Sequence, residues 1–235
     1  MKIALLGYGK MGKMIEAIAV KRGHEIVSII NKGDNTDLNN ADVAIDFSIP
    51  ESAFENITHC FEQGVPVICG TTGWLDRYEE AIAICKEKQG AFIYASNFSL
   101  GVNIFFELNR HLAKIMARLD DYEVSMEEIH HTHKLDAPSG TAITLAEGIM
   151  EHTEHKTWHL SNESENAKDM SIPVMAKRKG EVPGTHHVSW NSPVDRIDIS
   201  HTAHNREGFA LGAVMAAEWL KDKTGVFTMK DVLSL

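Results

Sequence analysis

Cysteine is scarce in this sequence, and so are long apolar runs and positive charge. The three cysteines, Cys60, Cys69 and Cys85, lie in apolar segments and form no C-x-x-C pair, which favours buried reduced thiols over a disulfide framework. No run reaches the ~18 apolar residues of a membrane span, and the opening MKIALLGYGK is too short to be a signal peptide. We therefore expect a cytoplasmic protein with no membrane partner.

The charge balance excludes a further class of partner. Lys and Arg total 23 against 33 Asp and Glu, so the formal net charge is −10. Such a chain is a poor match for nucleic acid, whose phosphates favour basic surfaces. A small anionic ligand is still compatible with this balance, because a few local positive groups suffice to bind it.

The N-terminal part alternates short apolar strands with helical periodicity. The predicted strands are 2–6, 25–30, 43–47, 66–69 and 91–95, and the predicted helices are 10–22, 50–63 and 75–88. Such βαβ alternation requires a parallel sheet with helices on its faces. Ligand sites are then expected at the carboxyl ends of the strands.

After Asn97 the pattern changes. A long amphipathic helix is predicted at 102–118, then a strand at 122–129, a helix at 139–150, a polar surface loop at 162–169, strand-like runs between 174 and 201, and a helix at 207–220. We predict an α/β protein in which residues 1–97 and 206–235 form a Rossmann-like, dinucleotide-binding domain. Residues 98–205 form an α+β domain for substrate binding and oligomerisation, with a mixed or antiparallel sheet. In the alternative, residues 174–201 extend the first sheet.

The motif GYGKMG, at 7–12, follows the first strand and opens the first helix. In that context Gly7 permits a tight turn, Gly9 lets the backbone approach a pyrophosphate, and Gly12 lets helix and strand pack closely. The N–H groups at the helix start favour the anion. A glycine turn that binds nothing is the structural alternative.

The second strand ends in Asn31-Lys32, where an acidic residue would grip the ribose hydroxyls of NAD. A lysine there suits a 2′-phosphate, so we favour NADPH over NADH, although Lys32 also fits an ordinary solvated lysine. Further strand ends supply DFS at 46–48, GTTG at 70–73 and SNF at 96–98. Each of these is weak alone, and only their shared position suggests a cofactor site.

The stretch EIHHTHKLDAPSGTA, at 128–142, has three interpretations. His131 and His133 with Asp136 would make a metal site, but Lys134 would place a cation beside the ion, so we predict no metal. The second interpretation is a solvent-exposed histidine-rich loop. In the third, the stretch supplies an acid and an anion-binding station to an enzyme.

The third interpretation uses the whole stretch. Ser139 is a plausible N-cap, and a helix that starts at Gly140 and Thr141 offers backbone N–H groups to a carboxylate. Lys134 and a histidine just upstream would hold a second carboxylate or donate a proton. A substrate that receives hydride from a nicotinamide needs such a proton.

These residues resemble the signature of the dihydrodipicolinate reductase family. The resemblance extends to GYGKMG, DFS, GTTG, ASNFSLGVN, RKGEVPG and HNREGFALGA, and therefore runs over nearly the whole chain in order. It implies an NAD(P)H-dependent oxidoreductase that reduces 4-hydroxy-tetrahydrodipicolinate, a small dicarboxylate, to tetrahydrodipicolinate in the diaminopimelate route to lysine. It also implies a homotetramer.

The resemblance assigns roles to particular residues. His130 is implied as proton donor and acceptor, Lys134 as second proton donor, His131 as a substrate contact, and Gly140 and Thr141 as holders of a substrate carboxylate. His133 has no implied role. The implied cofactor contacts are Gly7, Tyr8, Gly9, Lys10, Met11, Gly12, Lys32, Gly70, Thr71, Thr72, Ala95, Ser96, Asn97 and Phe98.

Two other functions stay open from sequence. A regulatory Rossmann protein would bind the nucleotide without turnover and would need neither Lys134 nor the helix start at 138–141. Another small-carboxylate dehydrogenase would share GYGKMG but has no reason to contain the whole 128–142 stretch. The acidic residue that many family members carry after the second strand is absent here, which puts the use of NADH in doubt.

Overall fold

The computed structural model describes residues 1–161 and 170–235, so the loop predicted at 162–169 lies outside the described residues. The chain forms two compact units, Met1–Leu100 with Glu207–Leu235, and Gly101–Arg206. The boundaries predicted after residues 97 and 205 lie three residues and one residue earlier. Leu100 belongs to the first unit because its side chain packs against that unit's apolar core.

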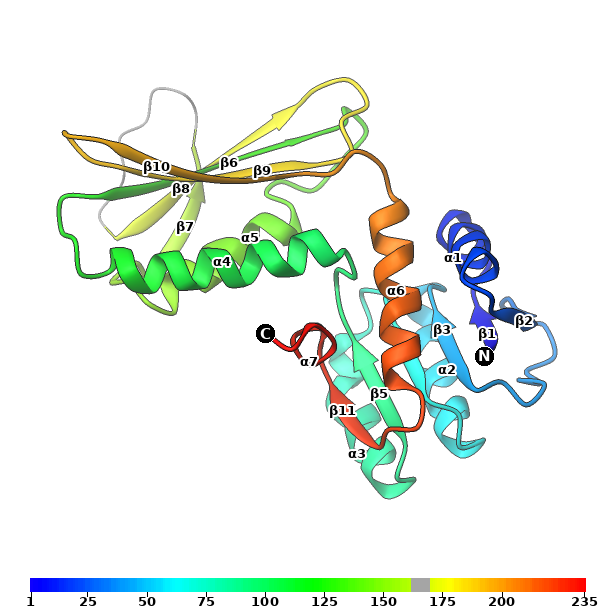
Figure 1. The fold of residues 1–235 in the computed structure, drawn as a ribbon. Coiled ribbons are helices and arrows are strands. Elements are labelled where there is room, and N and C mark those ends of the chain that lie inside the picture. Colours follow the sequence, from blue (N-terminus) through cyan, green and yellow to red (C-terminus); the bar gives the residue numbers. More distant parts are fainter. Residues whose placement is uncertain (162–169) are drawn as a thin grey trace. The chain divides into compact units, whose positions relative to one another are not determined.

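The first unit is built on a parallel sheet of six strands in the order β11-β5-β4-β3-β1-β2 (Figure 1). The strands are β1 (Lys2–Leu6), β2 (Glu25–Ile30), β3 (Val43–Asp46), β4 (Val67–Cys69), β5 (Ala91–Tyr94) and β11 (Gly225–Phe227). The helices are α1 (Lys10–Lys21), α2 (Pro50–Glu62), the 3-10 turn η1 (Leu75–Arg77), α3 (Tyr78–Glu87), α6 (Glu207–Leu220) and α7 (Met229–Leu233).

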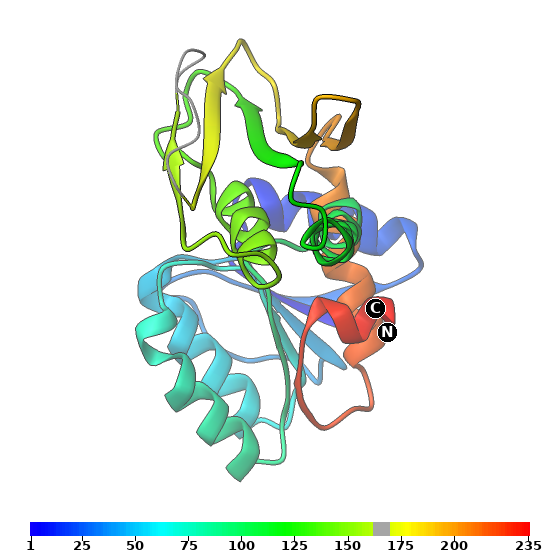
Figure 2. The same cartoon turned by 90° about the vertical axis from the view of Figure 1, so that its left-hand side faces the viewer.

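Both faces of this sheet are covered. Figures 1 and 2 show α1 and α6 on one face and α2 and α3 on the other. Each face has its own buried cluster, with Ile3, Leu5 and Ile45 on the α1 and α6 side, and Ala4 and Ala44 on the other. Residues of the central strands therefore alternate between two cores, which is why most of their positions are apolar.

The second unit carries a separate mixed sheet in the order β10-β9-β6-β8-β7. Its strands are β6 (Glu123–His130), β7 (Thr157–Leu160), β8 (Ser171–Arg178), β9 (Thr185–Asn191) and β10 (Arg196–Thr202), and its helices are α4 (Leu100–Met116), whose first residue belongs to the first unit, and α5 (Gly140–Met150). The α/β fold with a mixed second sheet is confirmed. The alternative that residues 174–201 extend the first sheet is wrong, because β8, β9 and β10 pair with each other and with β6 and β7.

Helices α4 and α5 lie against one face of this second sheet (Figure 1). The alternate residues Val124 and Met126 of β6 point into that core, and Glu128 and His130 continue the same buried row. Polar side chains thus take over the inward positions at the carboxyl end of the strand. None of the helices in the described residues is long and apolar enough to cross a membrane.

Candidate active site

The turn between β1 and α1 gives each of its three glycines a distinct steric setting. Gly7 has a φ of +90°, and a Cβ there would lie 2.4 Å from the carbonyl oxygen of Phe47. A Cβ on Gly12 would lie 2.4 Å from the carbonyl oxygen of Gly7, so helix and strand approach too closely for a side chain. A Cβ on Gly9 would meet nothing within 4 Å. Open space therefore lies over Gly9, where a pyrophosphate would fit.

This turn lies at the point where the strand order of the sheet reverses. β1 pairs with β2 on one side and with β3 on the other, and all three strands are parallel. The ends of β4 and β5 follow along the same edge. Ligands of such sheets bind outside the carboxyl ends of the strands at this reversal. The structure thus brings the predicted cofactor segments to one edge of the first unit.

A buried carboxylate ties the ends of β3 and β4 together. Asp46 is fully buried and accepts hydrogen bonds from the Ser48 hydroxyl (2.8 Å), the Asn56 amide (2.7 Å) and the Thr71 hydroxyl (2.6 Å). Burial raises the pKa of Asp46, while these donors act in the opposite direction. The sequence motif DFS gave this residue no role. The structure shows that it fixes the loop that begins at Gly70.

The predicted adenine end is more exposed. Lys10 and Lys32 are both exposed, and Met11 is half-buried. The backbone N–H of Tyr8 donates to the side-chain oxygen of Asn31 (3.0 Å), and the Tyr8 hydroxyl donates to Glu16. Asn31 therefore joins the glycine turn to the end of β2, at the position where an acidic residue would hold a ribose.

The predicted contacts after β4 and β5 differ in what they expose. Thr72 and Ser96 are exposed, Ala95 is half-buried, and the Asn97 side chain accepts the backbone N–H of Ser99 (2.8 Å). Phe98 is 1% exposed and its ring packs in the core, so this residue presents almost no surface to a ligand. A Cβ on Gly70 would lie 2.3 Å from the Phe47 ring, so Gly70 is closely packed as well.

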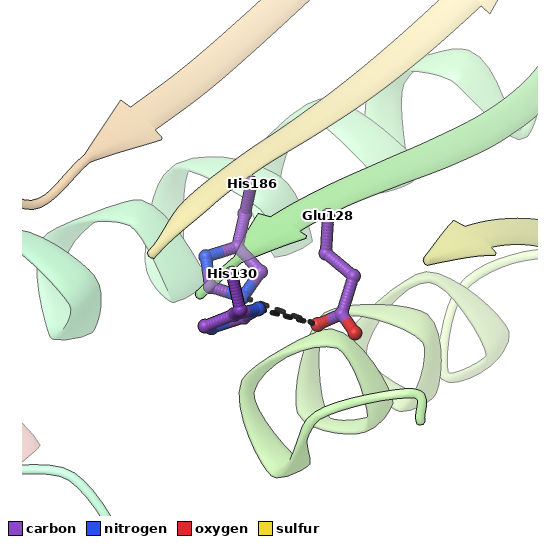
Figure 3. A group of neighbouring side chains, drawn as sticks. All are labelled: Glu128, His130 and His186. Carbon is purple, nitrogen blue, oxygen red and sulfur yellow. Dashed lines mark ion pairs between the residues drawn. The ribbon is translucent and has the colours of Figure 1, made fainter. Parts of the chain in front are cut away.

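In the second unit, one buried carboxylate holds the predicted chemical groups. Glu128 is 0% exposed, and both its oxygens accept the backbone N–H of Ser139 (3.0 and 3.1 Å). Its Oε2 lies 3.5 Å from His130 Nδ1 and 3.6 Å from His186 Nε2, as Figure 3 shows. Antiparallel pairing of β6 with β9 places Glu128 directly opposite His186.

The charges of this cluster are set by burial and by each other. Burial by itself raises the pKa of Glu128, but the nearby His186, the hydrogen bonds from Ser139 and the nearby His130 outweigh it and lower that pKa to about 2. Burial lowers the pKa of His130 to about 4, although Glu128 opposes this shift. At neutral pH the ligand-free chain therefore carries an ionised Glu128 and a neutral His130.

Arg178 connects this carboxylate to the loop that carries Lys134. Its guanidinium nitrogens lie 3.4 Å from Glu128 Oε1 and donate to the carbonyl oxygens of Lys134 (3.3 Å) and Asp136 (2.5 Å). Lys134 Nζ donates to both carboxylate oxygens of Asp136, at 2.7 Å each. The lysine is therefore held at the site by an anion, in the way that a substrate carboxylate would hold it.

The helix α5 begins as predicted at this cluster. The Ser139 hydroxyl accepts the backbone N–H of Ala142 (3.2 Å), so Ser139 is the N-cap. Gly140 is exposed, a Cβ there would meet nothing within 4 Å, and Thr141 is half-buried. The start of a helix presents N–H groups and a positive dipole end, and both favour a carboxylate.

The residues of the metal interpretation do not gather. His133 is exposed and faces Glu181 at 3.2 Å, and Asp136 is taken by Lys134. Three other residues do gather, since ligand-type atoms of Glu128, His130 and His186 lie within 4.8 Å of one another. The oxygens of that carboxylate already accept an N–H of the chain and face a guanidinium, so we interpret the group as a hydrogen-bonded ion cluster.

Sequence reasoning missed three residues of this cluster. Glu128 opened the quoted stretch, Arg178 is the first residue of RKGEVPG and His186 lies two residues after that segment, yet none was given a role. A signal for Glu128 was present, because it and His130 continue the inward row of Val124 and Met126. The pairing of β6 with β8 and β9, which supplies the other two, is not visible in a single sequence.

Two family models match the chain, "Dihydrodipicolinate reductase, N-terminus" over residues 1–98 and "Dihydrodipicolinate reductase, C-terminus" over residues 101–233. A curated 4-hydroxy-tetrahydrodipicolinate reductase of Christiangramia forsetii is 59% identical over 100% of this chain and 98% of its own. One of Archaeoglobus fulgidus is 35% identical over 99% of this chain and 100% of its own.

Solved structures agree on the fold. A dipicolinate-bound dihydrodipicolinate reductase from Paenisporosarcina sp. TG-14 is 22% identical, with a TM-score of 0.78 over 97% of both chains. A scyllo-inositol dehydrogenase from Lactobacillus casei with bound NAD(H) and scyllo-inositol is 12% identical, with a TM-score of 0.59 over 99% of this chain and 93% of that one.

The parallel sheet with its glycine turn and the two family matches define an NAD(P)H-dependent oxidoreductase. More particularly, the chain belongs to the dihydrodipicolinate reductase family, and the resemblance seen in the sequence is confirmed.

Proposed function

We propose that this chain catalyses the NAD(P)H-dependent reduction of 4-hydroxy-tetrahydrodipicolinate to tetrahydrodipicolinate, in the diaminopimelate route to lysine. The observation that carries the proposal is the full-length 59% identity to a reductase of that name. The geometry of the second unit supports it, because Glu128 and Arg178 link His130, the Lys134 loop and the start of α5 into one cluster. A dianionic substrate needs such paired anion-binding groups.

When bound, the reduced nicotinamide supplies the hydride. The first unit fits this cofactor, because the space over Gly9 is open to a pyrophosphate and the start of α1 faces it. The substrate's 4-hydroxyl leaves as water, so one hydride and one proton account for the rest of the change from substrate to product. The chain's own task is to hold two carboxylates and to deliver that proton. Gly140 and Thr141 are the proposed holders of one carboxylate, and Lys134, released from Asp136, and His131 are proposed to contact the other.

His130 is the proposed proton donor, with Lys134 as the second. With its pKa near 4, the His130 imidazole is neutral at pH 7 in the ligand-free chain. A substrate carboxylate nearby favours the imidazolium, so proton uptake accompanies substrate binding. Removing a general acid typically costs ~10²–10⁴ in rate, and we expect this loss in kcat for His130→Ala. His133→Ala is the control, because His133 is exposed on the loop that follows His130 and its ring nitrogen faces Glu181.

The test is a coupled assay in which pyruvate and aspartate semialdehyde are condensed to generate the substrate, and NAD(P)H absorbance is followed. The proposal predicts nucleotide oxidation that depends on the condensing enzyme. Failure with both nucleotides would contradict it. Lys134→Ala separates an enzyme from a regulatory nucleotide-binding protein, since kcat should fall while NAD(P)H binding is retained.

We also propose NADPH as the preferred nucleotide. Lys32 is exposed just after the end of β2, Lys10 is exposed at the start of α1, and Asn31 stands in place of an acid that would repel a 2′-phosphate. Lys32→Ala should raise the KM for NADPH and leave the KM for NADH unchanged. A wild-type KM that is clearly lower for NADH than for NADPH would overturn this preference.

A homotetramer in the cytoplasm completes the proposal. One face of the second sheet is covered by α4 and α5, and the described residues of that unit place no helix over its other face (Figure 1). A second copy of the chain is the occupant that the family resemblance implies. Light scattering should give four times the chain mass of 26.1 kDa, and a monomer at micromolar concentration would contradict this assembly.

A further inference from the structure

The most connected group in the second unit is a side chain to which no role has been assigned. Glu128 is fully buried, yet it lies against a helix N-cap, a guanidinium and two imidazoles. A buried carboxylate is costly unless such partners compensate for its lost hydration. Apolar residues occupy the two preceding inward positions of β6, so packing alone does not require an acid here.

We propose that Glu128 is a positioning residue. It orients the His130 ring, favours the protonated form of that ring and anchors the start of α5, which is the proposed carboxylate site. The proposal rests on the role of His130 given above and deepens it. Each part follows from a different contact of the same carboxylate.

The contact with His130 sets the imidazole. Nδ1 of His130 lies 3.5 Å from Glu128 Oε2, is buried, and has no hydrogen-bond partner among the described residues. On the other side of the ring, a Cβ on Gly184 would lie 3.1 Å from Nε2, so a larger residue there would crowd the imidazole. The ring is thus held between an anion and a glycine. An acid that faces one ring nitrogen fixes the orientation of the other.

The contact with Ser139 sets the helix end. The backbone N–H of Ser139 donates to both Glu128 oxygens, and the backbone N–H of Ala142 donates to the Ser139 hydroxyl. The N-terminal turn is thereby fixed at both sides of Gly140. Through Arg178, which donates to the carbonyl oxygens of Lys134 and Asp136, the same carboxylate also fixes the loop of the second proposed acid.

The charged and titratable groups facing His130 come from four segments. They are Glu128 on β6, Arg178 on β8, His186 on β9 and Lys134 on the loop after β6. Glu128 is the anion among them, and it alone favours the protonated imidazole, whereas the other three oppose it. Removing its charge should therefore lower the proton affinity of His130 further.

The experiment replaces the carboxylate with its neutral isostere in Glu128→Gln. We expect kcat to fall, and the limb of the kcat profile on which activity declines with rising pH should move down by about one pH unit or more. Glu127→Gln is the matched control, because Glu127 is the neighbouring residue of β6, is partly exposed and pairs with Lys177. It should leave both kcat and the limb where they are.

A second readout does not depend on turnover. In NMR titrations of the ligand-free protein, the protonation midpoint of His130 should be lower in Glu128→Gln than in wild type. Circular dichroism and melting curves identify a variant that fails to fold. In that case the comparison is repeated with Glu128→Asp, which keeps the negative charge on a shorter side chain. Glu128→Asp should retain the wild-type protonation midpoint of His130, while its kcat should fall.

Three outcomes would overturn the proposal. One is a folded Glu128→Gln with wild-type pH limb and His130 midpoint. The second is a folded Glu128→Asp with wild-type kcat, which would show that the reach of the carboxylate does not position the imidazole. The third is stoichiometric zinc in the purified wild-type protein that is lost in Glu128→Gln, which would make the cluster a metal site. If His130→Ala keeps the wild-type rate, the proposed role of His130 as proton donor is contradicted. The effect of Glu128 on the His130 protonation midpoint is still tested by the NMR titration.

Discussion

At the scale of single residues, the chemistry of this protein depends on where polar groups replace apolar ones. The inward row of β6 runs from Val124 and Met126 into Glu128 and His130, and burial with mutual contact sets the charge of both. The sequence singled out His130 because its motif is specific, and the role of His130 stays a prediction. Arg178 and His186 were not, because their approach to Glu128 depends on which strands pair and in which register.

The lowered pKa of His130 predicts a pH dependence of stability. An unfolded histidine titrates near 6.5 and the folded one near 4, so between these values the unfolded chain binds the proton more readily. The free energy of unfolding should therefore fall as pH drops from 6.5 to 4. Each pKa unit corresponds to at most about 1.4 kcal/mol.

Urea unfolding at several pH values measures this contribution. His130→Ala should flatten the fall between pH 6.5 and 4, whereas His133→Ala, whose side chain is 75% exposed, should leave it unchanged. An equal slope in wild type and His130→Ala would show that the imidazole is not held neutral by the fold.

At the scale of elements, two helix starts carry the proposed anion sites, and both place an open glycine there. A Cβ on Gly140 or on Gly9 would meet nothing within 4 Å. Packing does not demand glycine at either position, so the space is available to a ligand. Each site then predicts a variant that folds well and binds poorly.

Gly140→Ala should stabilise the protein by about 0.4–1 kcal/mol, because alanine restricts the unfolded chain and fits the helix. It should also raise the KM for the dicarboxylate about tenfold or more, since a charged hydrogen bond is worth about 1.5–3 kcal/mol. Gly208→Ala near the start of α6 is the control, because its Cβ would make only an ordinary contact at 3.7 Å. Unchanged KM in Gly140→Ala would remove this helix start from the site.

Gly9→Ala and Gly12→Ala should separate binding from folding in α1. Gly9→Ala should keep the wild-type melting temperature and lose affinity for NADPH, measured by fluorescence titration. Gly12→Ala should lower the free energy of unfolding by about 1–3 kcal/mol, because its Cβ would lie 2.4 Å from the Gly7 carbonyl oxygen. Tight NADPH binding by Gly9→Ala would contradict a pyrophosphate at that turn.

Most elements could be predicted from periodicity, and the exceptions have a common cause. β1, β2 and α6 have the bounds predicted for them, and the other predicted elements end within a few residues of those bounds. β7, β11 and α7 were missed because each is short and also lacks the fully buried run that the equally short β3 and β4 have. β11 is defined by its parallel pairing with β5, a strand that lies far from it in the sequence.

At the scale of the whole molecule, a chain of net charge −10 is proposed to bind an anionic cofactor and a dianionic substrate. The net negative charge does not prevent this binding, because positive groups are gathered at each proposed site. In this proposal the start of α1 with Lys10 and Lys32 serves one ligand, and the start of α5 with Lys134 serves the other. Backbone N–H groups supply much of the attraction, and they do not enter the charge count.

The central claim is that hydride passes from the nicotinamide to the dicarboxylate on this chain. NADPH that carries deuterium at both C4 positions of the nicotinamide, incubated with wild-type protein and freshly condensed substrate, tests it directly by mass spectrometry of the product. The account predicts tetrahydrodipicolinate that is heavier by one transferred deuterium. Unlabelled product, or oxidation of the nucleotide without tetrahydrodipicolinate, would contradict it.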